Sequence, residues 1–304
     1  MKLVAEGLRF PEGPVALADG CVLVAEIQGE SIACVDPVRG TVERIGACPG
    51  GPNGLAIGPD GALYICNNGG AEWKTSRGLL TPGIAGPTYT GGSIDRLDLA
   101  TGEATTLYAN CGTHRLSAPN DLVFDEAGGI WFTDMGKNQA RARAHGGVYY
   151  AQPDGSVVEE VIYPLTTPNG IGLSPDGAEL YVAETVPGRL WGFAVAGPGR
   201  LAPVSKGPHR GRLVHGFDGY QLLDSLAVDS EGNIAVATLV TGAISVLSPA
   251  GRLLEQICIP DGDPFVTNIC FGGPELRTAY ISSSGRGRLY ATEWPCPGLR
   301  LRFP

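Results

Sequence analysis

Long apolar runs and basic clusters are both missing from this sequence of 304 residues. No uninterrupted apolar stretch approaches the roughly 20 residues of a membrane-spanning helix, and residues 1–6 lack the apolar core of a signal peptide. Lysine and arginine together number 22 against 31 aspartates and glutamates, which gives a formal net charge of −9. We therefore expect a cytoplasmic protein that binds neither membranes nor nucleic acid.

Motifs for cofactors and nucleophiles are missing as well. The eight cysteines include no C-x-x-C pair, and several lie inside apolar runs such as 21–24 and 257–259. This placement favours reduced, buried thiols over disulfides or a zinc site. The sequence has no G-x-S-x-G elbow, no H-E-x-x-H and no Walker loop, and its four histidines lack metal-ligand spacing. No organic cofactor is predicted.

Glycine and proline, in contrast, are abundant, with 46 and 24 residues, and they punctuate a repeated phrase. The phrase is clearest in the ten residues Pro-Asn-Gly-Leu-Ala-Ile-Gly-Pro-Asp-Gly that begin at Pro52, and it returns in two good copies and three weaker ones. The polar residues that lead the six copies are spaced by 41, 67, 49, 55 and 44 residues: Glu12, Asn53, Asn120, Asn169, Asp224 and Asn268. Most of these spacings are close to the roughly 40 to 50 residues of a β-propeller blade.

Each copy predicts a small antiparallel sheet. It contains a short apolar run, a Gly/Asp/Pro turn and a second alternating run, which is a hairpin pattern and not a helical one. The sixth copy shows only three strands, at 269–271, 279–282 and 288–292, and residues 2–6 are the simplest source of a fourth. We therefore predict an all-β fold: a six-bladed β-propeller of four-stranded antiparallel blades, closed by the N-terminal strand, as a single domain over 1–304.

The second copy is longer than the others because of a Gly/Pro-rich stretch at 67–92. Long loops in compact domains are commonly functional or disordered. This stretch contains Trp73, Lys74, Arg77 and Tyr89. We hypothesise that it forms a lid over one mouth of the propeller.

The six lead residues predict a polar ring on the propeller axis. The first strand of each blade lines the central channel, so equivalent residues of the six copies should face one another. All six carry a side-chain oxygen, and two of them, Glu12 and Asp224, are carboxylates. Carboxylates gathered away from water require a counter-charge, and oxygen-only ligation suits Ca²⁺, Mg²⁺ or Mn²⁺ better than zinc. The ring therefore predicts one divalent cation, with Ca²⁺ favoured by the ligand type.

For any single copy, turn chemistry is the better explanation of the Pro-Asn-Gly phrase. A turn does not require the glutamate and the aspartate found at the same place in two other copies, and these favour a binding site. Asn53 and Asn268 have the stronger case for a structural role, because four protein ligands and water already fill a coordination shell.

Four segments carry a more specific signal: Phe-Pro-Glu-Gly-Pro at 10–14, Pro-Asn-Asp at 119–121, Pro-Asn-Gly-Ile at 168–171 and Asp-Ser-Leu-Ala-Val-Asp at 224–229. Together they resemble the signature segments of the senescence-marker-protein/gluconolactonase/luciferin-regenerating-enzyme family of six-bladed propellers. The resemblance extends over nearly the whole chain.

The resemblance implies a metal held by Glu12, Asn169 and Asp224. It also implies that Asn120 is a further metal ligand or orients the substrate, and that Asp224 is the general base. Members of the family are mostly lactonases, with relatives that hydrolyse organophosphates, and their metals vary among Ca, Zn, Mn, Mg and Fe(II).

One departure from the family concerns the substrate. Members that act on sugar lactones often carry an arginine two residues before the asparagine of the third blade, where this chain has Ala118. The loop after the next strand differs as well, and Lys137 or Asn138 is the expected substitute in substrate binding.

The sequence thus predicts a metal-dependent hydrolase that opens a small lactone. The cation would polarise the ester carbonyl, and a water activated by Asp224 or by the metal alone would attack. Phosphotriester hydrolysis at the same metal is the alternative among enzymes, and a non-catalytic propeller that binds Ca²⁺ or another ligand is the alternative outside them. The lactone, the metal and the oligomeric state stay open at this point.

Overall fold

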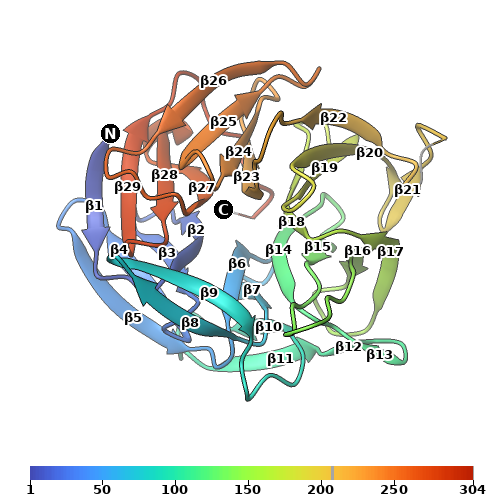
Figure 1. Ribbon diagram of the computed structural model, residues 1–304, viewed down its shortest axis with the longest axis horizontal. Coiled ribbons are helices and arrows are strands. Elements are labelled where there is room, and N and C mark those ends of the chain that lie inside the picture. Colours follow the sequence, from blue (N-terminus) through green and yellow to red (C-terminus); the bar gives the residue numbers. More distant parts are fainter. Residues whose placement is uncertain (207–208, 304) are drawn as a thin grey trace.

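The computed structural model describes residues 1–206 and 209–303. Figure 1 shows a ring of small sheets around one axis. Each of the six sheets contains four or five antiparallel strands, which confirms the predicted six-bladed β-propeller. Within the described residues the helical structure is one 3₁₀ turn, η1 (Pro274–Leu276), and no helix there is long and apolar enough to cross a membrane.

The first strand of each blade lies next to the axis, and the later strands follow outward. Blade 1 contains β2 (Pro11–Ala16), β3 (Val22–Glu26), β4 (Ser31–Asp36) and β5 (Thr41–Ala47). Blade 2 contains β6 (Pro52–Ile57), β7 (Leu63–Asn67), β10 (Ser93–Leu97) and β11 (Ala104–Tyr108). Blade 3 contains β14 (Pro119–Phe124), β15 (Ile130–Asp134), β16 (Gly146–Ala151) and β17 (Val158–Leu165).

The second half of the chain continues the pattern. Blade 4 contains β18 (Pro168–Leu173), β19 (Glu179–Glu184) and β20 (Arg189–Gly197), and then β21 (Arg200–Ala202) and β22 (Arg212–Gly216), which both pair with β20. Blade 5 contains β23 (Leu223–Val228), β24 (Ile234–Thr238), β25 (Ala243–Leu247) and β26 (Leu253–Cys258). Blade 6 contains β27 (Val266–Gly272), β28 (Thr278–Ser283), β29 (Arg288–Glu293) and β1 (Lys2–Glu6).

The N-terminal strand closes the ring, as predicted. β1 pairs antiparallel with β29, with Lys2 opposite Ala291 and Glu6 opposite Arg288. Val4 and Ala5 of this strand are 6% and 4% exposed. β1 is the outer strand of blade 6 and covers the edge of β29, which would otherwise be free to pair with other chains.

The core lies between the blades. The described residues form six apolar clusters, and each cluster joins one blade to its neighbour. Alternation along a strand explains this arrangement, because successive side chains point to opposite faces of the sheet. On β15, for example, Phe132 packs toward blade 2 and Trp131 toward blade 4.

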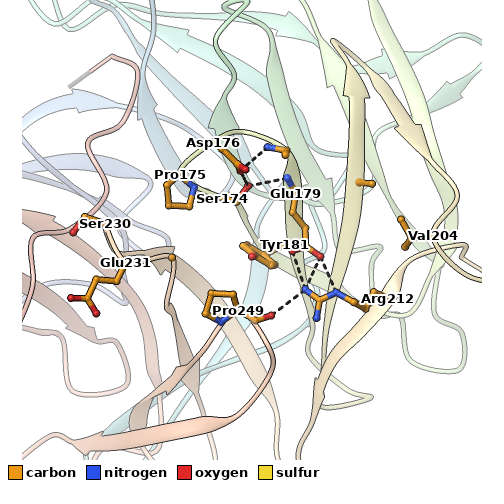
Figure 2. Close-up of a pocket in the computed structure, with 13 residues that line it drawn as sticks. Ser174, Pro175, Asp176, Glu179, Tyr181, Val204, Arg212, Ser230, Glu231 and Pro249 are labelled. Carbon is orange, nitrogen blue, oxygen red and sulfur yellow. Dashed lines mark hydrogen bonds and ion pairs between the residues drawn. The ribbon is translucent and has the colours of Figure 1, made fainter.

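Polar contacts add to this packing between blades 4 and 5. Figure 2 shows Arg212 of β22 directed at Glu179 of β19, with guanidinium–carboxylate distances of 2.7 and 2.9 Å. The same guanidinium donates to the backbone oxygen of Pro249 in blade 5, at 3.1 Å. A cavity of about 580 Å³ lies beside these residues. The charges of Glu179 and Arg212, which line it, are paired with each other.

All eight cysteines are free thiols, which agrees with the prediction of no disulfides. Cys48, Cys66, Cys111 and Cys296 are buried, whereas Cys258 is exposed. The expectation of buried thiols is therefore wrong for Cys258, which lies on β26, the outermost strand of blade 5.

Candidate functional site

The first strand of every blade contains the same irregularity. In blade 2, Pro52 pairs with Asn67 and Leu55 with Ile65, so three steps on β6 match two on β7. The five other first strands also take one step more than their partners at this place. Such a bulge redirects side chains and is common beside active sites. Here it repeats six times around one axis.

The bulges define a ring of residues in equivalent register, each one position after the first residue of its strand. The ring residues are Glu12, Asn53, Asn120, Asn169, Asp224 and Thr267. Five of them are at most 5% exposed, and Asp224 is partly exposed. The four predicted metal ligands are therefore all in the ring.

The sixth position of the ring differs from the sequence prediction, which placed Asn268 there. Val266 pairs with Ser283 at the register where Leu223 pairs with Thr238 in blade 5. Thr267 is therefore the equivalent of Asp224, and Asn268 lies one residue further along the strand. The sixth copy has no proline to mark its start, and the sequence comparison slipped by one position.

Asn268 belongs to a second tier beneath the ring. Its members are Gly13, Gly54, Asp121, Gly170, Ser225 and Asn268. The glycines are needed because adjacent first strands approach closely: a Cβ on Gly170 would lie 2.7 Å from Ser225 Cα and from Leu226 N. The Gly of the repeated phrase thus serves close packing around the axis, in addition to the turn chemistry considered from the sequence.

Glu12 is fixed by hydrogen bonds from two residues of the second tier. Its Oε2 accepts from the backbone N–H of Gly13 at 2.8 Å and from Nδ2 of Asn268 at 2.8 Å. Burial raises the pKa of Glu12 above its usual value, and these two hydrogen bonds oppose the rise. The carboxylate therefore has oriented partners but no counter-charge.

Asp224 and Asn169 form the opposite part of the site. Burial and the negative charge of Glu12 raise the pKa of Asp224 well above its usual value, and a hydrogen bond with the Asn169 side chain opposes the rise. The Asn169 amide also donates to Thr185 Oγ1 at 3.1 Å, which fixes its orientation. The negative charges of Glu12 and Asp224, which both lie near the axis, thus repel each other.

Two ring amides have an oxygen without a partner. Oδ1 of Asn120 and Oδ1 of Asn53 are buried and accept no hydrogen bond within the described structure. The amide nitrogen of Asn120 lies 3.6 Å from Sδ of Met135, so its oxygen points elsewhere. Unpaired buried acceptors are rare and indicate a missing ligand or water.

Asp121 is a site residue that the sequence analysis did not assign. It is 7% exposed and accepts from the backbone N–H of Leu122 at 2.9 Å. Burial and then the charge of Glu12 raise its pKa to about 7. The signal in the sequence was an aspartate at a place where three other copies have glycine. Asp121 puts a third acidic group next to the axis.

Lys137 and Asn138 lie on the segment between β15 and β16. Lys137 Nζ donates to the backbone oxygen of Asn68 at 2.8 Å and lies 5.0 Å from the ring centre of Tyr89. Burial lowers its pKa to about 8. Asn138 Oδ1 accepts from Arg143. In the described structure neither side chain is hydrogen-bonded to a ring residue, so their role in substrate binding stays a prediction.

The long segment of blade 2 forms a hairpin, β8 (Ala71–Ser76) and β9 (Leu79–Ala85), seen in teal in Figure 1. The N–H of Leu80 donates to Gly285 O in blade 6, and the N–H of Ala85 donates to Asn138 O in blade 3, both at 2.8 Å. Blades 3 and 6 are opposite each other in a six-membered ring. The hairpin thus runs from blade 6 to blade 3 over the side of blades 1 and 2, at the end of the propeller where the ring residues lie, and its role as a lid stays a hypothesis.

The other end of the axis contains a cavity of about 600 Å³. The far ends of the first strands line it together with the C-terminal residues 299–303. The C-terminus lies at the centre of the ring in Figure 1, and Phe303 packs edge-on against Phe124, with ring centres 5.4 Å apart. The C-terminal segment thus occupies this side of the axis, opposite the hairpin.

The match to known proteins decides the family. A family model described as the SMP-30/gluconolactonase/LRE-like region matches residues 10–285. The chain belongs to this family. The match to the SMP-30/gluconolactonase/LRE-like model includes all six ring residues and the hairpin.

Relatives of this SMP-30/gluconolactonase/LRE-like protein include lactonase drp35 of Staphylococcus epidermidis, which is 29% identical over 279 residues, 91% of this chain and 74% of that protein. Lactonase drp35 of Staphylococcus aureus is 30% identical over 264 residues, 86% of this chain and 71% of that protein. Among solved structures, a gluconolactonase from Xanthomonas campestris is 26% identical with a TM-score of 0.74, covering 96% of this chain and 89% of that chain.

The donor set of this family member can be tested for its fit to a metal. In the described chain no three Asp, Glu, His or Cys side chains gather as a metal group. The ring instead offers two carboxylates, Glu12 and Asp224, and the amide oxygens of Asn169 and Asn120. A hard divalent cation accepts such a set, would pair with the free Asn120 oxygen and would neutralise the carboxylates. The residues present therefore fit a cation of this kind.

Proposed function

We propose that this protein is a divalent-metal-dependent hydrolase that opens a small lactone. The observation that carries the proposal is the buried ring, in which two carboxylates without a counter-charge lie with an unpaired amide oxygen. The relatives named lactonase and gluconolactonase support the substrate class.

The metal would be held by Glu12, Asp224, Asn169 and Asn120, with Ca²⁺ favoured because all donors are oxygens. When bound, it would supply a Lewis acid that polarises the ester carbonyl. Asn268 and Thr185 orient Glu12 and Asn169 from outside this set, and such supporting bonds commonly tune metal sites.

Asp224 is the group that we propose to move the proton. The residue is partly exposed, which allows water to reach it. It takes a proton from water as the water oxygen bonds to the carbonyl carbon. The ring C–O bond then breaks, and the leaving oxygen takes the proton from Asp224 to give the hydroxy acid.

Metal content of the purified protein, followed by lactone hydrolysis after chelation and re-addition of single cations, tests the proposal. We expect close to one divalent ion per chain and activity restored by one cation. Asp224→Asn should abolish turnover, whereas Asn53→Ala, in the same ring but outside the ligand set, should reduce it far less.

Two other outcomes lead to different functions. Metal binding without turnover of any lactone would favour a non-catalytic calcium-binding propeller. A higher kcat/KM for activated phosphotriesters than for lactones would favour phosphotriester hydrolysis at the same metal.

A further inference from the structure

The residues just above the ring form a collar, which we define as the six residues two positions before the ring residues. The collar residues are Phe10, Gly51, Ala118, Thr167, Leu222 and Phe265. Each collar residue immediately precedes the first strand of its blade, so the collar lies at the end of the propeller where the ring residues lie. None of the six is charged.

The collar offers almost no hydrogen-bonding group to a substrate. All six of its backbone carbonyls already accept from backbone N–H groups of their own blades, at 2.8 to 3.2 Å. The one hydroxyl group, on Thr167, donates to Thr166 O at 2.7 Å and accepts from the N–H of Val186 at 3.0 Å. Next to the collar, the Met135 thioether contacts the Asn120 amide. The walls nearest to the ring are therefore apolar.

Three aromatic rings from separate segments meet on one side of the collar. The ring of Phe10 lies 5.1 Å from that of Trp73, on the hairpin, and 6.0 Å from that of Phe265. Phe10 is buried, whereas Trp73 and Phe265 keep partial exposure. Phe10 has a φ of 60°, a conformation that is unusual for a bulky residue and concentrates at functional positions.

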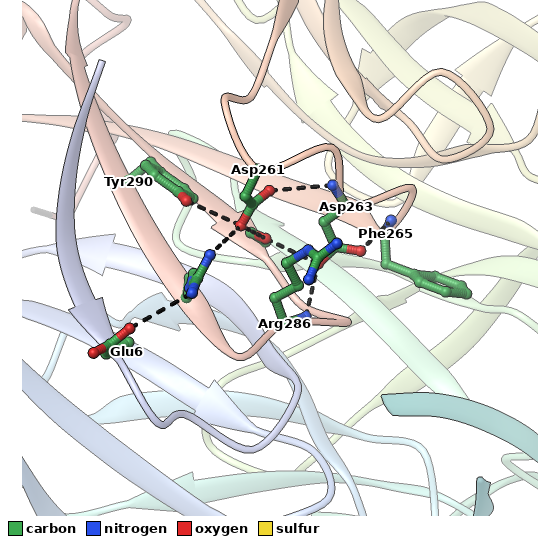
Figure 3. A network of polar contacts seen from close by, with 8 residues as sticks. Glu6, Asp261, Asp263, Phe265, Arg286 and Tyr290 are labelled. Atoms are coloured by element: carbon green, nitrogen blue, oxygen red, sulfur yellow. Dashed lines mark hydrogen bonds and ion pairs between the residues drawn. The ribbon is translucent and has the colours of Figure 1, made fainter. Parts of the chain in front are cut away.

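Phe265 is fixed in place by a polar network, shown in Figure 3. The carboxylate of Asp263 accepts from the N–H of Phe265 at 2.9 Å, from Ser283 Oγ at 2.8 Å and from the N–H of Arg286 at 2.8 Å. Asp263 is fully buried. A buried polar network whose members are satisfied rigidifies its surroundings. The Asp263 carboxylate therefore holds the backbone of Phe265 in one position.

We infer that the lactones opened at this site carry an apolar side chain and not the hydroxyl groups of a sugar, an inference that rests on the proposed function. Sugar hydroxyls entering this collar would lose water without gaining partners, which is unfavourable. An apolar chain packed against Phe10, Trp73 and Phe265 would gain affinity. Lys137, on the segment between β15 and β16, already donates to Asn68 O.

A series of γ-lactones with methyl, propyl and pentyl side chains, compared with glucono-δ-lactone, tests the inference. We expect kcat/KM to rise by up to about fourfold for each methylene buried, and the sugar lactone to be the poorest substrate. Trp73→Ala and Phe265→Ala should each reduce the ratio of pentyl to methyl kcat/KM by roughly tenfold or more.

Phe303→Ala is the matched control, because it removes a half-buried aromatic ring at the opposite end of the axis and should leave the ratio unchanged. Phe265→Leu provides a milder variant if the alanine protein does not fold. Preference for the sugar lactone, or an unchanged ratio in both the Trp73 and the Phe265 variants, would overturn the inference and leave the lactonase proposal standing. Failure to hydrolyse any lactone with any cation would instead refute the proposed function.

Discussion

The side-chain amide of Asn268, in the last blade, donates a 2.8 Å hydrogen bond to the carboxylate of Glu12, in the first blade. The two residues are 256 positions apart, and ring closure brings them together. Thr267 and Ser284 reinforce the junction through contacts with Pro11 O. The geometry at Glu12 therefore depends on the closed propeller and not on its own blade alone.

Asn268→Ala should weaken both the fold and metal binding. Glu12 would lose the amide donor of Asn268 and keep the N–H of Gly13, and loss of a bond to a charged group costs about 1.5–3 kcal/mol. Unfolding in urea measures the stability, and calorimetric titration with Ca²⁺ measures the affinity. Asn233→Ala is a suitable control, since it removes a 3.0 Å amide bond to Asp229 away from the ring. Equal loss of Ca²⁺ affinity in both variants would contradict this role of Asn268.

The metal-free protein should lose stability as the pH rises from about 5 to 8. The folded-state pKa values of Glu12, Asp121 and Asp224 are raised, so the folded chain binds these protons more tightly than the unfolded chain. Their contribution is complete below the unfolded pKa and is lost as the pH passes the folded pKa, which for Asp121 is about 7. For Asp121 the difference corresponds to about 4 kcal/mol.

Melting temperatures in the presence of a chelator, taken at pH 5, 6, 7 and 8, would show the decline. Asp121→Asn should flatten the profile, because the amide does not titrate. A divalent cation should restore more stability at pH 8 than at pH 5, since it binds the ionised carboxylates. A chelated protein that is equally stable at all four values would argue against uncompensated charge in the ring.

Much of the fold was predictable because each copy of the sequence repeat corresponds to one blade. Six copies of a hairpin phrase predicted six blades, and a sixth copy short of one strand predicted that residues 2–6 close the ring. The ring residues Glu12, Asn120, Asn169 and Asp224 were predictable for the same reason. Equivalent places in a repeat become equivalent places around an axis.

The errors arose at positions whose place in the ring depends on the strand register. The bulge adds one residue to each first strand, so a slip of one position exchanged Thr267 for Asn268. Asp121 was missed because the comparison of the copies stopped at their lead residues, and its electrostatic contact with Glu12 forms only in the closed ring. The contacts of the hairpin with blades 3 and 6 likewise depend on where the closed ring places those blades.

Val4→Asp should be strongly destabilising, whereas Leu3→Asp should not. Both residues lie on the closing strand β1, but Val4 is 6% exposed and Leu3 is 41% exposed. A charge at Val4 would enter the apolar cluster between blades 6 and 1, at a cost of at least about 3 kcal/mol. A charge at Leu3 would face solvent and cost less than about 1 kcal/mol.

Thermal unfolding together with light scattering would separate the two variants. We expect the Val4 variant to melt at a lower temperature and to aggregate, because an open blade 6 exposes the edge of β29. Similar melting temperatures for both variants would indicate that β1 contributes little to closure.

Gly170→Ala should disrupt the site through the backbone alone. The new Cβ would lie 2.7 Å from Ser225 Cα and 2.8 Å from Asp224 O, and these backbone atoms cannot move without shifting Asp224 itself. We expect a loss of about 2 kcal/mol or more in stability, together with a large fall in Ca²⁺ affinity and turnover. Gly216→Ala is the control, because no atom lies within 4 Å of its added Cβ. It should stay within about 0.5 kcal/mol of the parent. If Gly170→Ala binds Ca²⁺ and hydrolyses lactones like the parent, the close approach of blades 4 and 5 does not set the position of Asp224.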